Sequence, residues 1–146
     1  MLDFIATYSE LIIEGFLLTV GITLFGIFFG LALGILITLG DMYGGKVVSA
    51  VIRVYVEFFR GSPLVVQLFI ARYTVPDILH IPIDPYVVAF LVFALNSAAY
   101  QKGYIKGAIE TVFEDQMLAG LSTGMSKAQT IRHVILPQAL RIVIPA

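Results

Sequence analysis

The uncharged stretch GFLLTVGITLFGIFFGLALGILITLG, residues 15–40, decides the fold class of this chain. About 20 consecutive apolar residues in a helix are enough to cross the hydrocarbon core of a bilayer. The residues before this stretch include acids and no Lys or Arg, whereas a secretory signal peptide begins with positive charge. We therefore expect a membrane-spanning helix from about residue 11 to residue 39 that stays in the mature protein.

The composition of the whole chain agrees with a membrane protein. Of its 146 residues, 59% are hydrophobic and 13% are charged, against roughly 25% charged residues in a typical soluble domain. The formal net charge of −1 indicates no particular partner, and nucleic acid is not among the partners that we expect. With no cysteine and two histidines, the chain offers no thiol chemistry and no metal-ligand set. The predicted fold class is all-α, a polytopic transmembrane helical protein.

Glycines are frequent in the first segment, and two pairs have small-xxx-small spacing: Gly26 with Gly30, and Gly30 with Gly34. In lipid, small residues let neighbouring helices approach closely. Two interpretations stay open: a packing face against another helix, or the ordinary tolerance of membrane spans for glycine. Asp41 and the glycines at 44 and 45 predict that the helix ends in a tight turn.

A second span is expected from about residue 50 to 75, although Arg53, Glu57 and Arg60 interrupt it. Their i, i+4, i+7 spacing places all three on one helical stripe, where the acid can pair with either base. Charges at membrane depth are costly and face protein or water. The stripe is therefore either a charged lining near the inner mouth of a pathway or a salt bridge that fastens helices together. The sequence Gly-Ser-Pro at 61–63 predicts a local break in this helix.

Three prolines at 76, 82 and 85 predict a loop, after which a third span is expected over residues 85–105. Asn96 is a polar residue within this span. A buried amide in lipid usually bonds to a neighbouring helix, so we favour that interpretation over a contact with a transported substrate.

Polar and apolar residues are mixed over residues 106–136, which we expect to form a loop that carries short helices. Ser126 followed by Gln129 is typical of a capping box, so one helix should end near Thr123 and another should begin at Lys127. Residues 137–146 look like the start of a fourth span, with about half the length needed to cross. We therefore expect a sequence that is C-terminally truncated or a degenerate copy.

The distribution of Lys and Arg predicts the orientation. With these spans, one side holds Lys46, Arg53, Arg60, Lys102, Lys106, Lys127, Arg132 and Arg141, and the other side holds only Arg72. By the positive-inside rule, the N-terminus lies outside and the loop after the third span lies in the cytoplasm.

Three strings of the sequence resemble one family: EFFRGSPLVVQLF at 57–69, ALNSAAYQKGYIKGAIE at 94–110, and GMSKAQTIRHVILPQALRIVIPA at 124–146. They are similar to the permeases of polar amino-acid ABC importers, of the histidine, glutamine and arginine type, and the similarity runs nearly end to end. It implies one transmembrane permease domain over residues 1–146, with three full spans and the start of a fourth.

The resemblance includes the spacing of that family's cytoplasmic EAA loop, which is an EAA triplet, three residues, Gly, nine residues and I-x-L-P. Gly124 stands at the glycine and Pro137 closes the motif. The triplet differs, because Leu118 replaces Glu and Gly120 follows Ala119 where a second Ala is expected.

The resemblance implies that this loop is a helix-Gly-helix coupling joint that docks in a cleft of a cytoplasmic ATPase. The residues assigned to it are Leu118, Ala119, Gly120, Gly124, Ser126 and Pro137. The loss of the Glu removes a charge that hydrogen bonds could hold at the joint. The alternative for this segment is an amphipathic helix that lies on the inner leaflet.

The resemblance also implies a function: the permease subunit of an importer that moves a polar amino acid across the cytoplasmic membrane by alternating access. The implied partners are a second permease subunit, identical or similar, two cytoplasmic ATPases, an extracellular or periplasmic amino-acid-binding protein, and membrane lipid. The chain has no phosphate-binding loop with which to hydrolyse ATP, so we expect it not to be an enzyme and to hold no cofactor, with ATP and Mg in the ATPase.

Two alternative functions stay open. An ion-coupled secondary carrier is suggested by the intramembrane charges Arg53, Glu57 and Arg60. A non-transporting remnant is suggested by the altered triplet and the short fourth span.

Overall fold

A computed structural model describes residues 2–143 of the chain and the side chains of residues 8–143. Within that range the elements are α-helices and short π-helical turns without strands, so the all-α prediction is confirmed. In chain order the elements are α1 (Leu2–Tyr43), α2 (Gly45–Gly61), α3 (Leu64–Phe69), η1 (Ile70–Thr74), α4 (Val75–Leu79), α5 (Pro85–Ser122), α6 (Lys127–Thr130), η2 (Ile131–Ile135) and α7 (Leu136–Val143).

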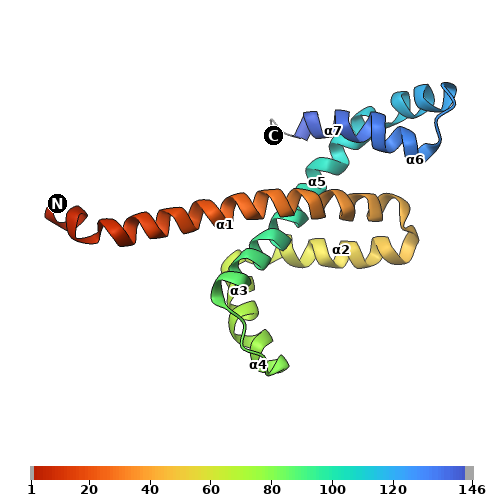
Figure 1. The fold of residues 1–146 in the computed structure, drawn as a ribbon. Helices are drawn as coiled ribbons and strands as arrows, with labels where there is room; N and C mark the ends of the chain where they lie inside the picture. The colour runs from red at the N-terminus through yellow and green to blue at the C-terminus, as the bar shows by residue number, and fades with distance from the viewer. Residues whose placement is uncertain (1, 144–146) are drawn as a thin grey trace.

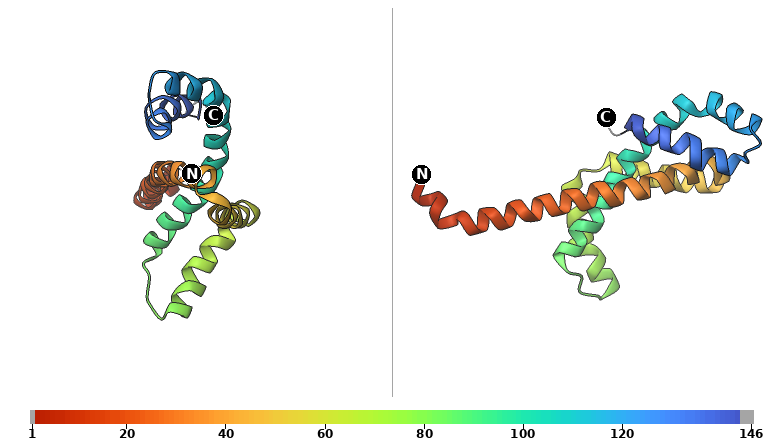
Figure 2. Two further views of the ribbon diagram at one scale, coloured as in Figure 1. Left: turned by 90° about the vertical axis from the view of Figure 1, so that its right-hand side faces the viewer. Right: turned by 45° about the horizontal axis from the view of Figure 1, so that its top comes forward.

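Helix α5 is the element around which the others are arranged (Figure 1). It starts beside α3 and η1, crosses α1 and α2, and ends beside α6, η2 and α7, all of which it contacts. The two views in Figure 2 show α1 and α2 as a hairpin, with α3 and α4 on one side of it and α6 and α7 on the other. Each of the other described elements except α4 thus packs against α5, and α4 packs on η1.

The close crossing of α1 and α5 depends on glycine. A methyl group added at Gly26 would lie 3.4 Å from Phe93 Cβ, and one added at Gly34 would lie 3.2 Å from Ile105 Cδ1. At Gly30 it would overlap the Ser97 side chain. These three glycines are one helical turn apart, so they form a strip that faces α5. The packing-face interpretation is confirmed.

The turn after α1 shows two differences from expectation. Asp41 lies inside α1 instead of in the turn, which is formed by Gly44 and by Gly45 at φ +81°.

Residues 40–46, GDMYGGK, also match the G-x-x-x-x-G-K pattern of a phosphate-binding loop, but Val47 follows where such a loop needs Ser or Thr. Residues 40–43 belong to a helix, whereas a phosphate-binding loop follows a strand.

The bend in the second predicted span is sharper than the local break that the sequence predicts. The axis from Gly45–Gly61 to Leu64–Leu79 bends by 108°. The predicted loop at Pro76 is wrong, because helix continues through Pro76 to Leu79. The π-helical turn η1 ends two residues before that proline, and a widened turn accommodates a residue that has no N–H to donate. The loop is confined to residues 80–84.

The third predicted span and the following loop form one helix. We expected helix to end near residue 105, but α5 runs unbroken to Ser122. Its two halves bury residues against different neighbours: the first half packs on α1, and the second half packs through Ile105, Ala108 and Ile109 on Ile135 and Ala139. The tertiary contacts of the second half stabilise helix in a stretch whose composition is that of a loop.

The described chain exposes apolar helix surface suited to lipid or to other membrane helices. Helix α1 is long and apolar enough over Tyr8–Tyr43 to cross a membrane, and the bent pair α2 with α3–α4 passes the same test together. Leu11, Phe16 and Phe28 on α1 are each about two thirds exposed. The number of spans and their exact limits stay a prediction.

Candidate functional site

The turn between α5 and α6 has the geometry of a helix C-cap that uses glycine. Gly124 N–H donates to the Leu121 carbonyl at 3.0 Å and Met125 N–H donates to the Gly120 carbonyl at 3.1 Å, the two bonds of a Schellman motif. Gly124 has φ +85°, a conformation that favours glycine over other residues. The predicted helix end near Thr123 is confirmed.

The start of the next helix is also as predicted. Ser126 Oγ accepts a hydrogen bond from Gln129 N–H at 3.3 Å, and Ser126 N–H donates to Gln129 Oε1 at 2.8 Å. The two bonds complete the capping box at the start of α6. Helix therefore resumes at Lys127, and the chain reverses direction within four residues.

The altered triplet divides into an inner and an outer part. Gly120 is buried against Thr130 of α6, where an added methyl group would overlap the Thr130 side chain. Leu118 is 67% exposed and Ala119 is also exposed. Glycine at the third position is thus explained by close packing between α5 and α6, while the first two positions face away from the described chain.

The segment after the turn is held to α5. Residues 127–143 continue through α6, η2 and α7 without a break. The π-helical turn η2 ends two residues before Pro137, as η1 does before Pro76. Gln138 Nε2 donates to Gln116 Oε1 at 3.1 Å across the α5–α7 contact. A displacement of α6 is therefore passed to both α5 and α7.

A cavity of about 720 Å³ lies behind the turn. Its lining comes from the end of α1, the second half of α5 and the segment after the turn: Leu39, Tyr43, Phe113, Met117, Lys127, Ala128, Ile131, Arg132 and Leu136. The lining is mostly apolar and includes two cations, Lys127 and Arg132.

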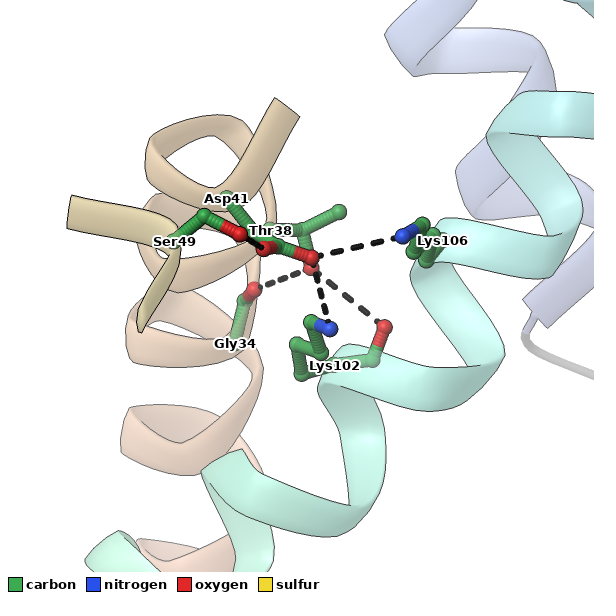
Figure 3. Close-up of polar contacts among 6 residues, drawn as sticks. All are labelled: Gly34, Thr38, Asp41, Ser49, Lys102 and Lys106. Carbon is green, nitrogen blue, oxygen red and sulfur yellow. Dashed lines mark hydrogen bonds and ion pairs between the residues drawn. The ribbon is translucent and has the colours of Figure 1, made fainter. Parts of the chain in front are cut away.

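A half-buried charge network joins α1, α2 and α5 close to this cavity (Figure 3). Asp41 Oδ2 lies 2.7 Å from Lys102 Nζ and 3.4 Å from Lys106 Nζ, while Ser49 Oγ donates to Asp41 Oδ1 at 2.6 Å. Thr38, one turn before Asp41, donates to the carbonyls of Gly34 in α1 and Lys102 in α5. The network fixes the register between α1 and α5 where the glycine strip ends.

Sequence reasoning missed this network. Lys102 and Lys106 are four residues apart and so share a face of α5, which is the available signal. Their partner Asp41 lies in a different helix, and the sequence does not reveal which acid the crossing brings to that face.

The charged stripe of α2 lies on the exposed side of that helix. Arg53, Glu57 and Arg60 are all exposed, and no ion pair within 4.0 Å joins Glu57 to either arginine in the part of the chain that the structure describes. The Arg60 guanidinium instead lies over the ring of Tyr100 in α5, 5.4 Å from its centroid. Among the described residues the stripe therefore forms no salt bridge that fastens helices together, and its interpretation as a pathway lining stays a prediction.

Asn96 bonds to neighbouring helices, as favoured from the sequence. Its Nδ2 donates to Gln67 Oε1 in α3 at 3.0 Å and to the Phe59 carbonyl in α2 at 3.3 Å. Gln67 was not expected to take part, because a Gln in an apolar run gives no indication of its partner.

Comparison with known proteins identifies relatives over almost the whole chain. Residues 11–146 match the family model described as the binding-protein-dependent transport system inner membrane component. The glutamine transport system permease protein GlnP of Escherichia coli (strain K12) is 36% identical over 136 residues, which cover 92% of this chain and 62% of GlnP. The arginine transport system permease protein ArtQ of Bacillus subtilis (strain 168) is 33% identical, over 99% of this chain and 67% of ArtQ.

The fold is similar to that of a solved amino acid ABC transporter, crystallised with histidines. The TM-score is 0.82 at 31% identity, over 97% of this chain and 65% of that chain. The chain thus spans less than two thirds of the length of GlnP and of the solved transporter. On this evidence the chain belongs to the family of binding-protein-dependent transport system inner membrane components.

Proposed function

We propose that this chain is the permease subunit of an ATP-binding-cassette importer that moves a polar amino acid across the cytoplasmic membrane. The observation that carries the proposal is the turn from α5 into α6, which combines the spacing of the EAA loop with two exposed triplet positions, Leu118 and Ala119. The names of GlnP, ArtQ and the solved transporter support amino acids as the substrate class. An ion-coupled carrier is not favoured, because the family is binding-protein-dependent.

In this proposal the turn is the joint that receives motion from an ATPase. The ATPase binds the outer face at Leu118 and Ala119 and pushes on the turn when it closes. Because Gly120 of α5 is in direct contact with Thr130 of α6, the push on α5 is transmitted to α6. With Leu118 at the first triplet position, the contact is apolar, and it gains free energy from burial of that side chain instead of from a charged hydrogen bond.

The motion then travels through α5. Gln116 and Gln138 link α5 to α7, and the network at Asp41 links α5 to the α1–α2 hairpin. The helix rocks the bundle between states that open to opposite sides of the membrane, which is alternating access. We place the N-terminus outside and the turn in the cytoplasm, in agreement with the excess of Lys and Arg on that side.

The remaining parts of the importer come from partners. A second permease subunit, identical or similar, faces this one, with the stripe Arg53, Glu57 and Arg60 and the neighbouring Asn96 near the shared pathway. Two ATPases hold ATP and Mg, and an external binding protein delivers the amino acid. The permease itself has no catalytic role.

A co-purification experiment tests the joint. The permease is expressed with the ATPase of its own transport system, and ATPase recovery is compared for native permease, Ala119→Arg and Gly124→Trp. We expect both variants to lose the ATPase, since the first places a charge on the docking face and the second strains the turn. Thr111→Arg is the matched control, because Thr111 is also exposed on α5 but lies two turns before the triplet. Equal recovery with all four permeases would contradict the proposed joint.

A further inference from the structure

The sharp bend between α2 and α3 removes a backbone hydrogen bond at a defined place. Pro63 has no N–H, so the carbonyl of Phe59, four residues earlier, loses the donor that a continuous helix would supply. The last backbone bond of α2 runs from Ser62 N–H to the Phe58 carbonyl at 3.1 Å, and the first of α3 runs from Gln67 N–H to the Pro63 carbonyl at 3.2 Å. An unsatisfied carbonyl away from water costs several kcal/mol, so Phe59 requires another donor.

Two side-chain amides supply it. Gln67 Nε2 donates to the Phe59 carbonyl at 2.9 Å, and Asn96 Nδ2 donates to the same oxygen at 3.3 Å. Gln67 Nε2 also reaches the carbonyl and the hydroxyl of Ser62, at 3.0 and 2.9 Å. One buried glutamine of α3 is therefore bonded to the last turn of α2 and to its C-cap residue.

The two amides also bond to each other. Asn96 Nδ2 donates to Gln67 Oε1 at 3.0 Å, so both hydrogens of the Asn96 amide are used within the chain. Gln67 is 3% exposed, and Tyr55 O–H adds a further bond from α2 to the Leu95 carbonyl of α5 at 2.6 Å. The end of α2, the bend, α3 and the middle of α5 are joined into one hydrogen-bonded unit.

We propose that Gln67 and Asn96 are positioning residues that form an amide clamp, which sets the angle between α2 and α3 and ties the bend to α5. Its part in transport rests on the proposed function, because α5 carries the joint at its other end. Through the clamp, the bent segment follows α5 as a rigid body when the joint moves. Asn96 then acts on the protein backbone and not on the transported substrate.

A distance measurement tests the clamp directly. The natural sequence has no cysteine, so spin labels can be attached at Val51→Cys on α2 and Ile78→Cys on α4, both exposed positions. With 1.5 Å of rise per residue and the 108° bend, the two backbone positions lie about 25 Å apart, against about 40 Å for a straight helix. Labelled permease is diluted with unlabelled permease so that only distances within one chain count.

The variants are chosen to remove donors without adding charge. We expect Gln67→Met and Asn96→Leu each to broaden the distance distribution and move it toward longer values. The matched control is Gln101→Met, because Gln101 is an amide on the same helix as Asn96 whose bonds go to Ser97 and to Ile27 of α1. A narrow distribution of unchanged centre in both clamp variants would overturn the proposal, and so would an equal change in the control.

A second variant distinguishes the effect of the angle between α2 and α3 from the effect of leaving the Phe59 carbonyl without a donor. Pro63→Ala returns the missing N–H, so Pro63→Ala combined with Gln67→Met should form a nearly straight, stable helix with the longer distance. If the angle matters for transport, this double variant regains thermal stability because the Phe59 carbonyl again has a donor, while uptake stays well below that of the native permease because the bend is lost. Recovery of native uptake in the straightened variant would overturn the role of the angle. Because the distances are measured without transport, failure of the importer function would leave the test of the clamp intact.

Discussion

At the scale of single residues, the glycines of α1 divide into those that contact α5 and those that do not. Gly30 lies against Ser97, whereas a methyl group at Gly21 would meet nothing within 4 Å. We predict that Gly30→Ile destabilises the permease by about 1–3 kcal/mol, because the added side chain overpacks the crossing. Gly21→Ile, the same change on an open face, should have little effect. Thermal unfolding of the purified permease measures both, and equal melting temperatures would contradict the predicted contact.

Asp41 provides a second prediction at this scale. Asp41→Asn leaves the half-buried Lys102 without its carboxylate, and we expect a loss of about 1–3 kcal/mol. Lys102→Met in the same chain should restore part of that loss, since the unpaired cation is removed. Lys106→Met should cost less than either single change, because Lys106 is more exposed and lies 3.4 Å from the carboxylate. A double-variant cycle with no coupling between Asp41 and Lys102 would count against the network.

Single residues also show what the sequence could reveal. The capping box at Ser126 and the αL glycine at 124 were predictable, because their partners lie within a few residues. The glycine strip was visible as a repeat, although its partner was not. The pairs Asp41–Lys102 and Asn96–Gln67 depend on which helices cross and in what register, and one sequence without homologues does not contain that information.

At the scale of elements, the joint depends on contact between α5 and α6. We predict that Gly120→Val separates the two helices, because the new side chain would overlap Thr130, and that ATPase binding is lost. Gly107→Val is the matched control on the same helix, as an added methyl there meets nothing within 4 Å. Co-purification with the ATPase gives the result, and retained binding by Gly120→Val would show that the joint tolerates a gap.

The elements that differed from expectation have a common cause. Composition suggested loops at Pro76 and over residues 106–122, yet both are helical. A π-helical turn accommodates the proline, and contacts with η2 and α7 stabilise the second half of α5. Local propensity is a weak determinant of helix when tertiary packing opposes it.

At the scale of the whole molecule, α5 connects the parts that the proposed function requires. Its first half meets the amide clamp, its middle meets the glycine strip and the network at Asp41, and its end carries the joint. The fold class and the family could be predicted from the sequence, because hydropathy and motif spacing are read along the chain and do not depend on which helices contact each other. The 108° bend could not be predicted, because the sequence Gly-Ser-Pro indicates that the helix breaks but not at what angle.

The measurement that tests the central claim most directly is amino-acid uptake by the assembled transporter in proteoliposomes, with and without ATP on the ATPase side. Glutamine, arginine and histidine are offered with the binding protein on the opposite side and with no ion gradient. The account predicts uptake of at least one of them that requires ATP and that Ala119→Arg abolishes while Thr111→Arg does not. Uptake that is driven by an ion gradient and ignores ATP would contradict the importer in favour of a secondary carrier, and no uptake by a fully assembled complex would favour a non-transporting remnant.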